Sequence, residues 1–366
     1  MDLPLSTPVR PGIGEPAPWF AAPSGDVAQF HFASLGGRNV VLCFHGTDIT
    51  EAEAATDLLT AWAEGMNERH VVSFAVVTND RGIAARFRWP RLRLFRDDPS
   101  GSIAQAYGIG PEGGWVVVDT LMRVLMRAPL SAGAAVLVRV ATLPPAGLMA
   151  SMDAPAPVLA VPGIFEPEFC RQLIALYQAH GGADSGFMRE KEGRTVGTID
   201  HGFKRRRDMI INDQAVIAAA RTRIERRLLP MIIRALQFRT TRMERYIVAC
   251  YDAAEQGFFR AHRDNTTRGT AHRRLAVSIN LNAEEFEGGE LCFPEFSPRT
   301  YRPTTGGAVV FSCSMLHEAQ PVTRGTRYAF LPFLYDEAGA KLREANARFL
   351  TGETEIIGPS ASAHHR

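Results

Sequence analysis

The sequence predicts two domains, an α/β domain followed by a β-sandwich or jelly roll with flanking helices. The chain has 366 residues, which is more than one ordinary hydrophobic core organises. A segment rich in Pro, Ala and Gly at 141–163 separates alternating strand-like and helix-like patterns from a series of short strand-like runs. We therefore expect domains at 1–143 and 158–366, joined by a linker at 144–157.

In the first domain, apolar runs at 38–46 and 70–80 predict two strands that are buried on both faces. Between them, residues 51–69 have the periodicity of a helix with one apolar side. Residues 115–127 predict two further strands around a tight turn. A βαβ unit followed by such a hairpin predicts an α/β domain with a mixed sheet.

In the second domain, amphipathic patterns predict helices at 166–182 and 212–237. Asp213 can cap the start of the second helix, and Pro230 is expected to kink or divide it. From residue 242 onward the chain consists of short strand-like runs separated by Gly, Pro and Asn, which is typical of a β-sandwich or jelly roll.

Composition and charge favour a cytoplasmic protein without a nucleic-acid or membrane partner. The chain is 46% hydrophobic with a formal net charge of +2, and its short basic run at 205–207 predicts a solvated face. The sequence lacks both a signal-peptide pattern at its start and an uninterrupted apolar stretch of about 18 residues, the length that spans a membrane. Five cysteines without a CxxC spacing are expected to be buried thiols in a reducing compartment.

Three residues of the β-rich region form a candidate metal site. His262 and Asp264 are two positions apart, so in a strand their side chains lie on the same side. His317 follows a separate apolar strand that can return it to the same place. Two imidazoles and one carboxylate on one face of a metal suit Fe(II) and leave three positions open. Arg327 lies ten residues further on, and its guanidinium is a permanent donor for a distal carboxylate.

The region at about 242–337 resembles the catalytic domain of Fe(II)/2-oxoglutarate-dependent dioxygenases of the prolyl-hydroxylase type. The resemblance rests on the segments "IVACYDAAEQGFFRAHRDN", "INLN", "FEGGELCFPE" and "RPTTGGAVVFSCSMLHEAQPVTRGTRYAF". It implies a double-stranded β-helix in which His262, Asp264 and His317 are the catalytic iron ligands.

The same resemblance implies a binding site for 2-oxoglutarate. Arg327 matches the basic residue that pairs with the C5 carboxylate of this cosubstrate, and Tyr251 matches a tyrosine that contacts it. The alternative for Tyr251 is an aromatic ring packed inside the barrel. Asn280 stands where some relatives have a further cosubstrate-binding tyrosine, and Phe259 replaces a tyrosine found near the site in some relatives.

The implied reaction is hydroxylation of a C–H bond by dioxygen, with release of succinate and carbon dioxide and with ascorbate as a reductant. A carboxylate at Asp264, where related halogenating enzymes have a small residue, favours hydroxylation. The implied substrate is a prolyl residue of a protein or peptide, with a small molecule as the alternative, and a homodimer is compatible with the sequence. Residues 183–206 are interpreted either as a lid or as an ordinary surface loop.

The first domain resembles a peroxiredoxin-like domain with a thioredoxin fold over residues 10–128. The segments "GEPAPWFAAPSGD", "FASLGGRNVVLCFHGTD", "RLRLFRDDPSGSIAQAYGI" and "GWVVVD" carry this resemblance. Peroxiredoxins have a T-x-x-C motif after the first core strand, whereas Thr50 and Glu53 stand three residues after Thr47 and Thr50 here. Since a thiolate is the nucleophile of that chemistry, we expect a scaffold without peroxidase activity.

Two other classes of function stay open at this point. One is a non-catalytic interaction protein, and the other is a thiol peroxidase that works through Cys43 or through a cysteine of the second domain. Three further histidine positions are not expected to bind metal. His201 is one, His272 lacks a carboxylate partner at metal-ligand spacing, and the pair at 364–365 ends a Ser- and Ala-rich tail.

Overall fold

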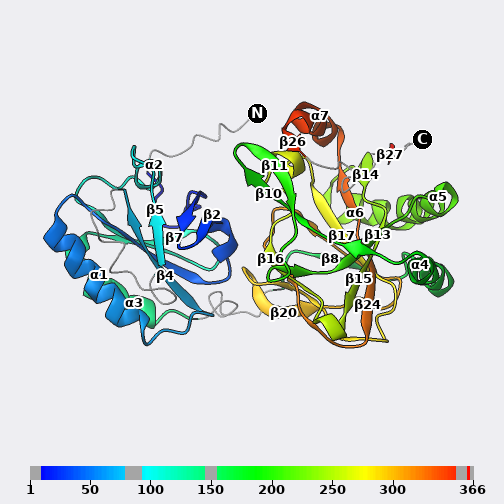
Figure 1. The fold of residues 1–366 in the computed structure, drawn as a ribbon, viewed down its shortest axis with the longest axis horizontal. Coiled ribbons are helices and arrows are strands. Elements are labelled where there is room, and N and C mark those ends of the chain that lie inside the picture. Colours follow the sequence, from blue (N-terminus) through cyan, green and yellow to red (C-terminus); the bar gives the residue numbers. More distant parts are fainter. Residues whose placement is uncertain (1–9, 79–92, 145–154, 352–360, 363–366) are drawn as a thin grey trace. The chain divides into compact units, whose positions relative to one another are not determined.

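The computed structural model describes residues 10–78, 93–144, 155–351 and 361–362. The chain divides into two compact units, one made of Met1–Ala154 with Pro294–Pro298 and the other of Pro155–Phe293 with Arg299–Arg366 (Figure 1). The division after Ala154 lies inside the segment expected to be a linker, most of which falls outside the described residues. The histidines at 364–365 also fall outside them.

The first unit is built on a five-stranded mixed sheet with the strand order β5, β4, β3, β6, β7. Its strands are β3 (Asn39–Phe44), β4 (Val71–Val77), β5 (Arg93–Arg96), β6 (Gly114–Val118) and β7 (Val124–Ala128). β3, β4 and β5 run parallel to one another, whereas β6 is antiparallel to both β3 and β7. The mixed α/β architecture is as predicted, and the assignment to the thioredoxin fold stays a prediction.

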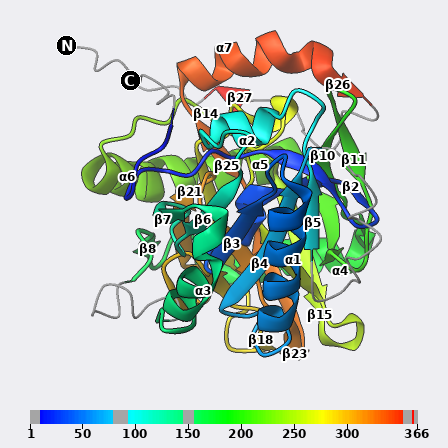
Figure 2. The same ribbon diagram turned by 90° about the vertical axis from the view of Figure 1, so that its left-hand side faces the viewer.

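Both faces of this sheet are covered, which explains the continuous apolar runs in its central strands. Val41 and Cys43 of β3 pack toward α1 (Ile49–Ala63) and α3 (Gly133–Ala141), and both helices lie in front of the sheet in Figure 2. Leu42 and Phe44 belong to a second core on the opposite face. That core also takes residues from the hairpin β1 (Ala21–Ser24) and β2 (Val27–His31) and from α2 (Ser102–Ala106).

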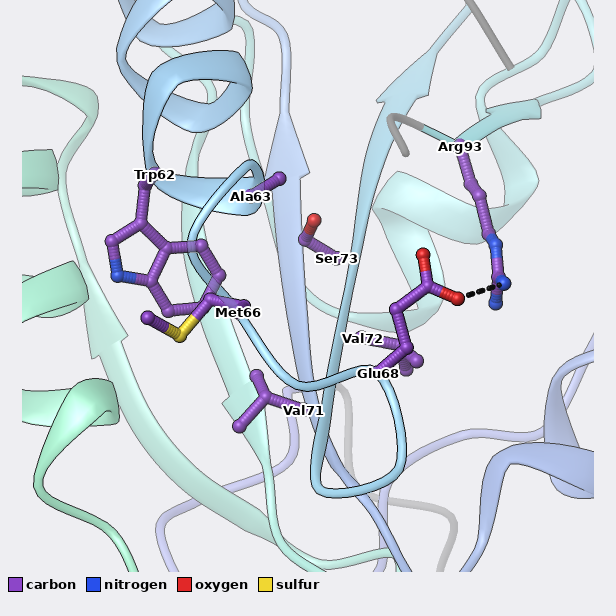
Figure 3. A pocket seen from close by; sticks show the side chains of 8 residues that line it. All are labelled: Trp62, Ala63, Met66, Glu68, Val71, Val72, Ser73 and Arg93. Atoms are coloured by element: carbon purple, nitrogen blue, oxygen red, sulfur yellow. Dashed lines mark hydrogen bonds and ion pairs between the residues drawn. The ribbon is translucent and has the colours of Figure 1, made fainter. Parts of the chain in front are cut away.

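A shallow pocket of the first unit lies beside the end of α1 and the start of β4 (Figure 3). Trp62, Met66 and Val71 give it apolar walls. Its charged groups are Glu68 and Arg93, which pair with each other at 2.9 Å between Oε2 and Nη2. Its one hydroxyl group belongs to Ser73, and its lining residues include no set of metal ligands.

The second unit contains two antiparallel sheets, an arrangement consistent with the predicted jelly roll. In the large sheet the strand order is β27, β14, β25, β17, β24, β15, β13, β9, while β21 pairs with β17 and β8 pairs with β21. Its strands are β8 (Leu159–Val161), β9 (Ala183–Asp184), β13 (Arg207–Ile210), β14 (Arg242–Glu244), β15 (Ile247–Asp252), β17 (Leu275–Asn280), β21 (Ala308–Ser312), β24 (Thr326–Phe330), β25 (Phe333–Tyr335) and β27 (Ala361–Ser362).

The smaller sheet has the strand order β12, β16, β22, β19, β20. Its strands are β12 (Lys204–Arg205), β16 (Phe258–His262), β19 (Leu291–Phe293), β20 (Ser297–Tyr301) and β22 (His317–Ala319). A short two-stranded sheet of β18 (Glu287–Gly288) and β23 (Val322–Arg324) completes this part of the unit.

The segment at 183–206 is not an ordinary surface loop. It forms a regular hairpin of β10 (Phe187–Lys191) and β11 (Arg194–Thr198), in which the two strands are paired along their full length. β26 (Leu350–Thr351) adds to β11 in parallel, so the hairpin is fixed to a segment near the end of the chain. Its function as a lid stays a prediction.

Three helices pack on one face of the large sheet (Figure 1). They are α4 (Pro167–His180), α5 (Gln214–Arg223) and α6 (Leu229–Leu236). The Asp213 carboxylate accepts hydrogen bonds from the backbone N–H groups of Ala215 and Val216, as expected of an N-cap. Pro230 divides the predicted second helix. The turn before it is a π-helix over Ile224–Leu228, because proline cannot donate the next helical hydrogen bond.

A further helix, α7 (Glu337–Asn346), follows the last strand of the large sheet. None of the helices in the described part of the chain combines the length and apolar character needed to cross a membrane.

Because side chains alternate along a strand, the two faces of the large sheet carry different sets of residues. The helix-facing residues include Val248 and Cys250 of β15 and Val277 and Ile279 of β17, all of them members of the main core. The residues between them point to the opposite face, and these are Ala249, Tyr251, Ser278 and Asn280. Arg327 of β24 is paired with Tyr251 and therefore shares this second face.

A buried ionic network lies where β14, the turn before β17, and α7 meet. The Glu244 carboxylate accepts hydrogen bonds from Arg273 Nε at 2.7 Å and from His272 Nε2 at 3.0 Å, and Arg343 Nε lies 3.5 Å away. His272 thus has a carboxylate partner, but from a strand distant in sequence. Because guanidinium groups surround that carboxylate, the pair is not a metal site. Arg273 also donates to the backbone carbonyl of Asp264 at 3.4 Å.

Glu244 should therefore contribute strongly to stability at neutral pH. Burial alone would raise the pKa of this carboxyl, but Arg273 and then His272 outweigh burial and hold the pKa at about 2, below its ordinary 4.5. Because the pKa is lower in the folded state, the contribution is present above pH 4.5 and is lost as the pH falls toward 2. We expect Glu244→Gln to destabilise the second unit by about 3 kcal/mol at pH 7.

Peptide-resolved hydrogen exchange over 242–252 is the suitable measurement, because all four tryptophans lie in the first unit and fluorescence would not report on the second. The matched control is Glu337→Gln, which removes an exposed carboxylate paired with Arg242 at 2.7 Å and should cost less than about 1 kcal/mol. The expectation would be contradicted if Glu244→Gln and Glu337→Gln lost equal stability at pH 7, or if their difference in stability persisted at pH 2.

Candidate metal centre

The structure brings the three predicted ligand residues together. β16 ends at His262 and β22 begins at His317, and the antiparallel register places these two residues opposite each other. Asp264 follows two positions after His262, held by its backbone N–H, which donates to the Cys313 carbonyl at 2.9 Å. One ligand atom from each of the three side chains lies within 4.8 Å of the others. Among the described residues, this is the one group with such a spacing.

The orientation of both imidazoles fits a metal between them. His262 Nδ1 lies 2.7 Å from the Arg260 carbonyl, and His317 Nδ1 lies 3.0 Å from the Met315 carbonyl. A carbonyl only accepts, so each Nδ1 carries the proton and each Nε2 offers its lone pair. These Nε2 atoms lie 3.5 and 3.4 Å from different oxygens of Asp264. Such distances are long for hydrogen bonds but leave room for an ion that all three groups coordinate.

The protonation states also suit metal ligation. Burial would raise the pKa of Asp264, but His317 and His262 hold it well below its usual range, so the group is a carboxylate. Burial, together with His262, lowers the pKa of His317 to about 4, which leaves a neutral imidazole at pH 7. A metal needs its histidine ligands neutral and its carboxylate ligands ionised, and His317 and Asp264 are in these states. The donor set therefore fits Fe(II).

Arg327 is buried on the sheet face that borders this site. Its Nε donates to Asn280 Oδ1 at 3.2 Å and its Nη2 donates to Ser278 Oγ at 2.9 Å, so both partners are neutral. The guanidinium carbon lies 5.1 Å from the centre of the Tyr251 ring. The amide N–H of Asn280 donates a hydrogen bond to the Pro303 carbonyl at 2.9 Å. Asn280 therefore orients Arg327 and has both ends of its amide engaged by the protein.

Phe259 forms one wall of the site. Its ring stacks on the imidazole of His262, with ring centres 3.5 Å apart and an angle of 22° between the planes. Phe187 of the β10–β11 hairpin and Phe203 pack against Phe259 at centre distances of 6.3 and 5.8 Å. We call Phe187, Phe203 and Phe259 the aromatic wall. It restricts the rotation of His262 and connects this imidazole to the hairpin.

The basic run at 205–207 is not a solvated face, and this prediction was wrong. Arg206 is buried, donates to Asp208 Oδ2 at 2.6 Å and lies 3.3 Å from the Tyr251 hydroxyl. Arg207 is exposed, and Arg205 is half-buried. The chain is extended here, so alternate residues point to opposite sides and Lys204, Arg206 and Asp208 form the inward set. The missed signal was this two-residue period, which a count of basic residues does not reveal.

Residues from each of these groups border one cavity. Its lining combines the three ligand residues, Tyr251 and Arg327 with two more arginines, Arg206 and Arg245, and with an apolar set formed by Phe259, Ala276, Val277, Leu291, Phe311, Ala319, Leu331, Pro332 and Phe333. Metal ligands, a cation for a distal carboxylate and apolar walls thus share one space. His201 lies elsewhere, partly exposed and 3.5 Å from Asp184 Oδ2.

The comparisons with known proteins concern the same stretch of chain. Residues 246–335 match the family model of the 2OG-Fe(II) oxygenase superfamily. Two curated relatives are PKHD-type hydroxylases. The hydroxylase of Delftia acidovorans is 40% identical over 81 residues, which cover 20% of this chain and 36% of the relative. The hydroxylase of Verminephrobacter eiseniae is 34% identical over 83 residues, which cover 20% of this chain and 37% of the relative. The chain thus spans less than two-fifths of the length of either relative.

Among solved structures, a Trichoplax adhaerens prolyl hydroxylase in complex with a hypoxia-inducible-factor peptide matches with a TM-score of 0.39 and 17% identity, over 51% of this chain and 86% of that one. A Pseudomonas putida prolyl-4-hydroxylase matches with a TM-score of 0.39 and 18% identity, over 49% and 92%. The family match and the hydroxylase relatives support a 2OG-Fe(II) oxygenase domain of prolyl-hydroxylase type in the C-terminal region of the chain.

Proposed function

We propose that the second unit is an Fe(II)- and 2-oxoglutarate-dependent dioxygenase that hydroxylates a C–H bond. The observation that carries this proposal is the convergence of two imidazole Nε2 atoms and one carboxylate in a cavity that also holds the buried Arg327. The match of residues 246–335 to the oxygenase superfamily supports it. Bound Fe(II) with 2-oxoglutarate supplies the oxidation that turns C–H into C–OH with dioxygen, releasing succinate and carbon dioxide.

His262, Asp264 and His317 would hold the iron on one side and leave the cavity side open. Carbonyls at both Nδ1 positions fix the imidazole tautomers, and the stacked ring of Phe259 fixes the orientation of His262. Asp264 reduces the charge of the site by one. Because it fills a ligand position with a carboxylate, it favours hydroxylation over halogenation.

Arg327 would bind the distal carboxylate of 2-oxoglutarate. Its guanidinium is already fixed by Ser278 and Asn280, so little freedom is lost when the cosubstrate binds. The Tyr251 hydroxyl lies on the same sheet face and is a second donor for that carboxylate. Apolar walls around the cavity exclude water from the reacting groups.

The substrate that we propose is a prolyl residue of a protein or peptide, with ascorbate as the reductant that maintains Fe(II). The support is the description of the curated relatives as PKHD-type hydroxylases and the likeness of 242–337 to prolyl hydroxylases.

A thiol peroxidase is the weaker alternative. All five cysteines are buried, and burial raises the pKa of each thiol. The pKa of Cys43 lies well above its usual range, and those of Cys170 and Cys292 are raised to about 12 and about 11. Since the thiolate is the nucleophile, none of these groups is suited to attack a peroxide at neutral pH.

Removal of a ligand tests both the oxygenase proposal and the non-catalytic alternative. His262→Ala and Asp264→Ala are expected to reduce bound iron to background and to abolish 2-oxoglutarate-dependent succinate formation, because two ligands cannot retain Fe(II) at this site. Metal analysis and succinate quantification are the measurements, and His201→Ala is the matched histidine control. Iron retained by both variants, or a wild-type protein that binds iron but forms no succinate, would refute the proposed activity.

Removal of the guanidinium tests cosubstrate anchoring. Arg327→Ala is expected to raise the KM for 2-oxoglutarate by about 10- to 100-fold, since a charge-assisted hydrogen bond to a carboxylate contributes roughly 1.5–3 kcal/mol. Bound iron should stay at the wild-type level, and Arg327→Lys should recover part of the affinity. An unchanged KM in Arg327→Ala would show that the distal carboxylate binds elsewhere.

A further inference from the structure

A second cluster of basic residues, distinct from Arg327, contributes Arg206 and Arg245 to the lining of the same cavity. It consists of Lys204, Arg206 and Arg245 around the single carboxylate of Asp208. Arg206 Nη2 and Arg245 Nη2 donate to the same oxygen, Asp208 Oδ2, at 2.6 and 3.1 Å. Lys204 Nζ donates to neutral oxygens of Ser185 and Gly186, both at 2.6 Å. Two guanidinium groups thus share one carboxylate, while the Lys204 amine has neutral partners.

The hydrogen-bonding capacity of this cluster is not used up by the protein. The Nε atoms of Arg206 and Arg245 are buried and have no hydrogen-bond partner in the described structure, and the same holds for the acceptor Asp208 Oδ1. Arg206 is only 7% exposed, and both arginines line the cavity that holds the candidate metal ligands. Buried donors without partners are rare in folded proteins, and such groups in a cavity point to a ligand that completes them.

The backbone at Arg245 supports the same interpretation. Its φ is +65°, a left-handed conformation that costs a non-glycine residue free energy. Arg245 stands between β14 and β15, and this conformation breaks the regular strand at the point where its side chain enters the cavity. Glycine or asparagine adopts such a conformation more readily, so an arginine at this position indicates that its side chain has a function.

The charges of the cavity show what kind of ligand is missing. Three guanidinium groups, of Arg206, Arg245 and Arg327, face the carboxylates of Asp208 and Asp264, which leaves one positive charge. A divalent iron adds two positive charges, and the 2-oxoglutarate dianion removes two. One positive charge is therefore still unbalanced in the loaded site. Lys204 is left out of this count because it does not line the cavity and its Nζ donates to Ser185 and Gly186.

We propose that the substrate of this site carries a carboxylate close to the carbon that is hydroxylated, and that Arg206 and Arg245 bind this carboxylate. The inference rests on the proposed oxygenase function and names the substrate class that it acts on. A single carboxylate matches the one unbalanced charge, whereas a phosphate dianion would exceed it. Guanidinium forks are also the groups best suited to a planar carboxylate.

Binding is measured on the full chain loaded with Fe(II) and 2-oxoglutarate under anaerobic conditions, so that no turnover occurs. The probes are N-acetylglycine, N-acetyl-L-proline and N-acetyl-L-leucine, each compared with its own amide by calorimetry. We expect at least one acid to bind about tenfold more tightly than its amide, because the amide lacks the charge. If no acid shows this preference, the inference fails.

Four variants test whether the preference for the acid over its amide depends on Arg206 and Arg245. Arg206→Gln and Arg245→Gln should reduce it to less than about threefold, while Arg207→Gln, the exposed neighbour, should leave it intact. Asp208→Asn removes the competing carboxylate and should strengthen binding of the acid, whereas a purely structural ion pair would predict weaker binding. A preference retained in both Arg206→Gln and Arg245→Gln, or lost together with 2-oxoglutarate affinity, would overturn the assignment.

Two more measurements separate this inference from the proposed function and identify the source of the carboxylate. Iron content and 2-oxoglutarate affinity are determined on the same preparation. If iron content and 2-oxoglutarate affinity are normal but no acid binds more tightly than its amide, this inference alone fails. If iron and 2-oxoglutarate do not bind while the preference for the acid persists, the oxygenase function fails. A capped Asp-Pro peptide compared with its Asn-Pro counterpart then tells a side-chain carboxylate from the terminal carboxylate of a free acid.

Discussion

The antiparallel register between β16 and β22 is the constraint on which the candidate site depends. It sets His262 directly opposite His317, and the irregular step within β16 between Phe259 and His262 gives the strand the room to do so. Because strand side chains alternate with a period of two, a slip of one residue would turn one imidazole to the other face of the sheet. The pairing of β15 with β24 does the same for Tyr251 and Arg327. Two independent strand pairings thus place the candidate metal ligands and the pair of Tyr251 and Arg327 in the lining of one cavity.

The large sheet buries apolar side chains on one face and polar side chains on the other. Its helix-facing residues belong to one continuous apolar core, whereas the opposite face carries hydroxyl, amide and guanidinium groups that hydrogen-bond to one another. Polar groups in such a setting are costly unless satisfied, so the hydroxyl of Ser278 and the amide of Asn280 serve to hold Arg327 as much as to fill space. The apolar core on one face therefore supports a rigid polar surface on the other.

Part of this arrangement could be predicted from the sequence and part could not. His262 and Asp264 were predictable because a two-residue spacing in a strand has one geometric meaning, and His317 and Arg327 followed from their order in a β-rich segment. The cluster around Asp208 was missed, since its members come from 204–208 and 245 and only the pairing of β13 with β15 brings them together. His272 is not part of a metal site, as expected, but its partner Glu244 was not predictable, because it is distant in sequence. In the first unit the strands were predictable from their apolar runs, but its assignment to the thioredoxin fold is still a prediction.

The parallel pairing of β26 with β11 connects a segment near residue 350 to His262, one of the three candidate metal ligands. Thr195 and Val196 of β11 take their edge partner from Leu350 and Thr351, and the hairpin in turn presses Phe187 into the aromatic wall beside His262. Strain applied to β26 would reach the imidazole through two strand pairings, β26 with β11 and β11 with β10, and two ring contacts. A change that displaces β26 is therefore expected to shift the imidazole of His262 without any ligand entering the cavity.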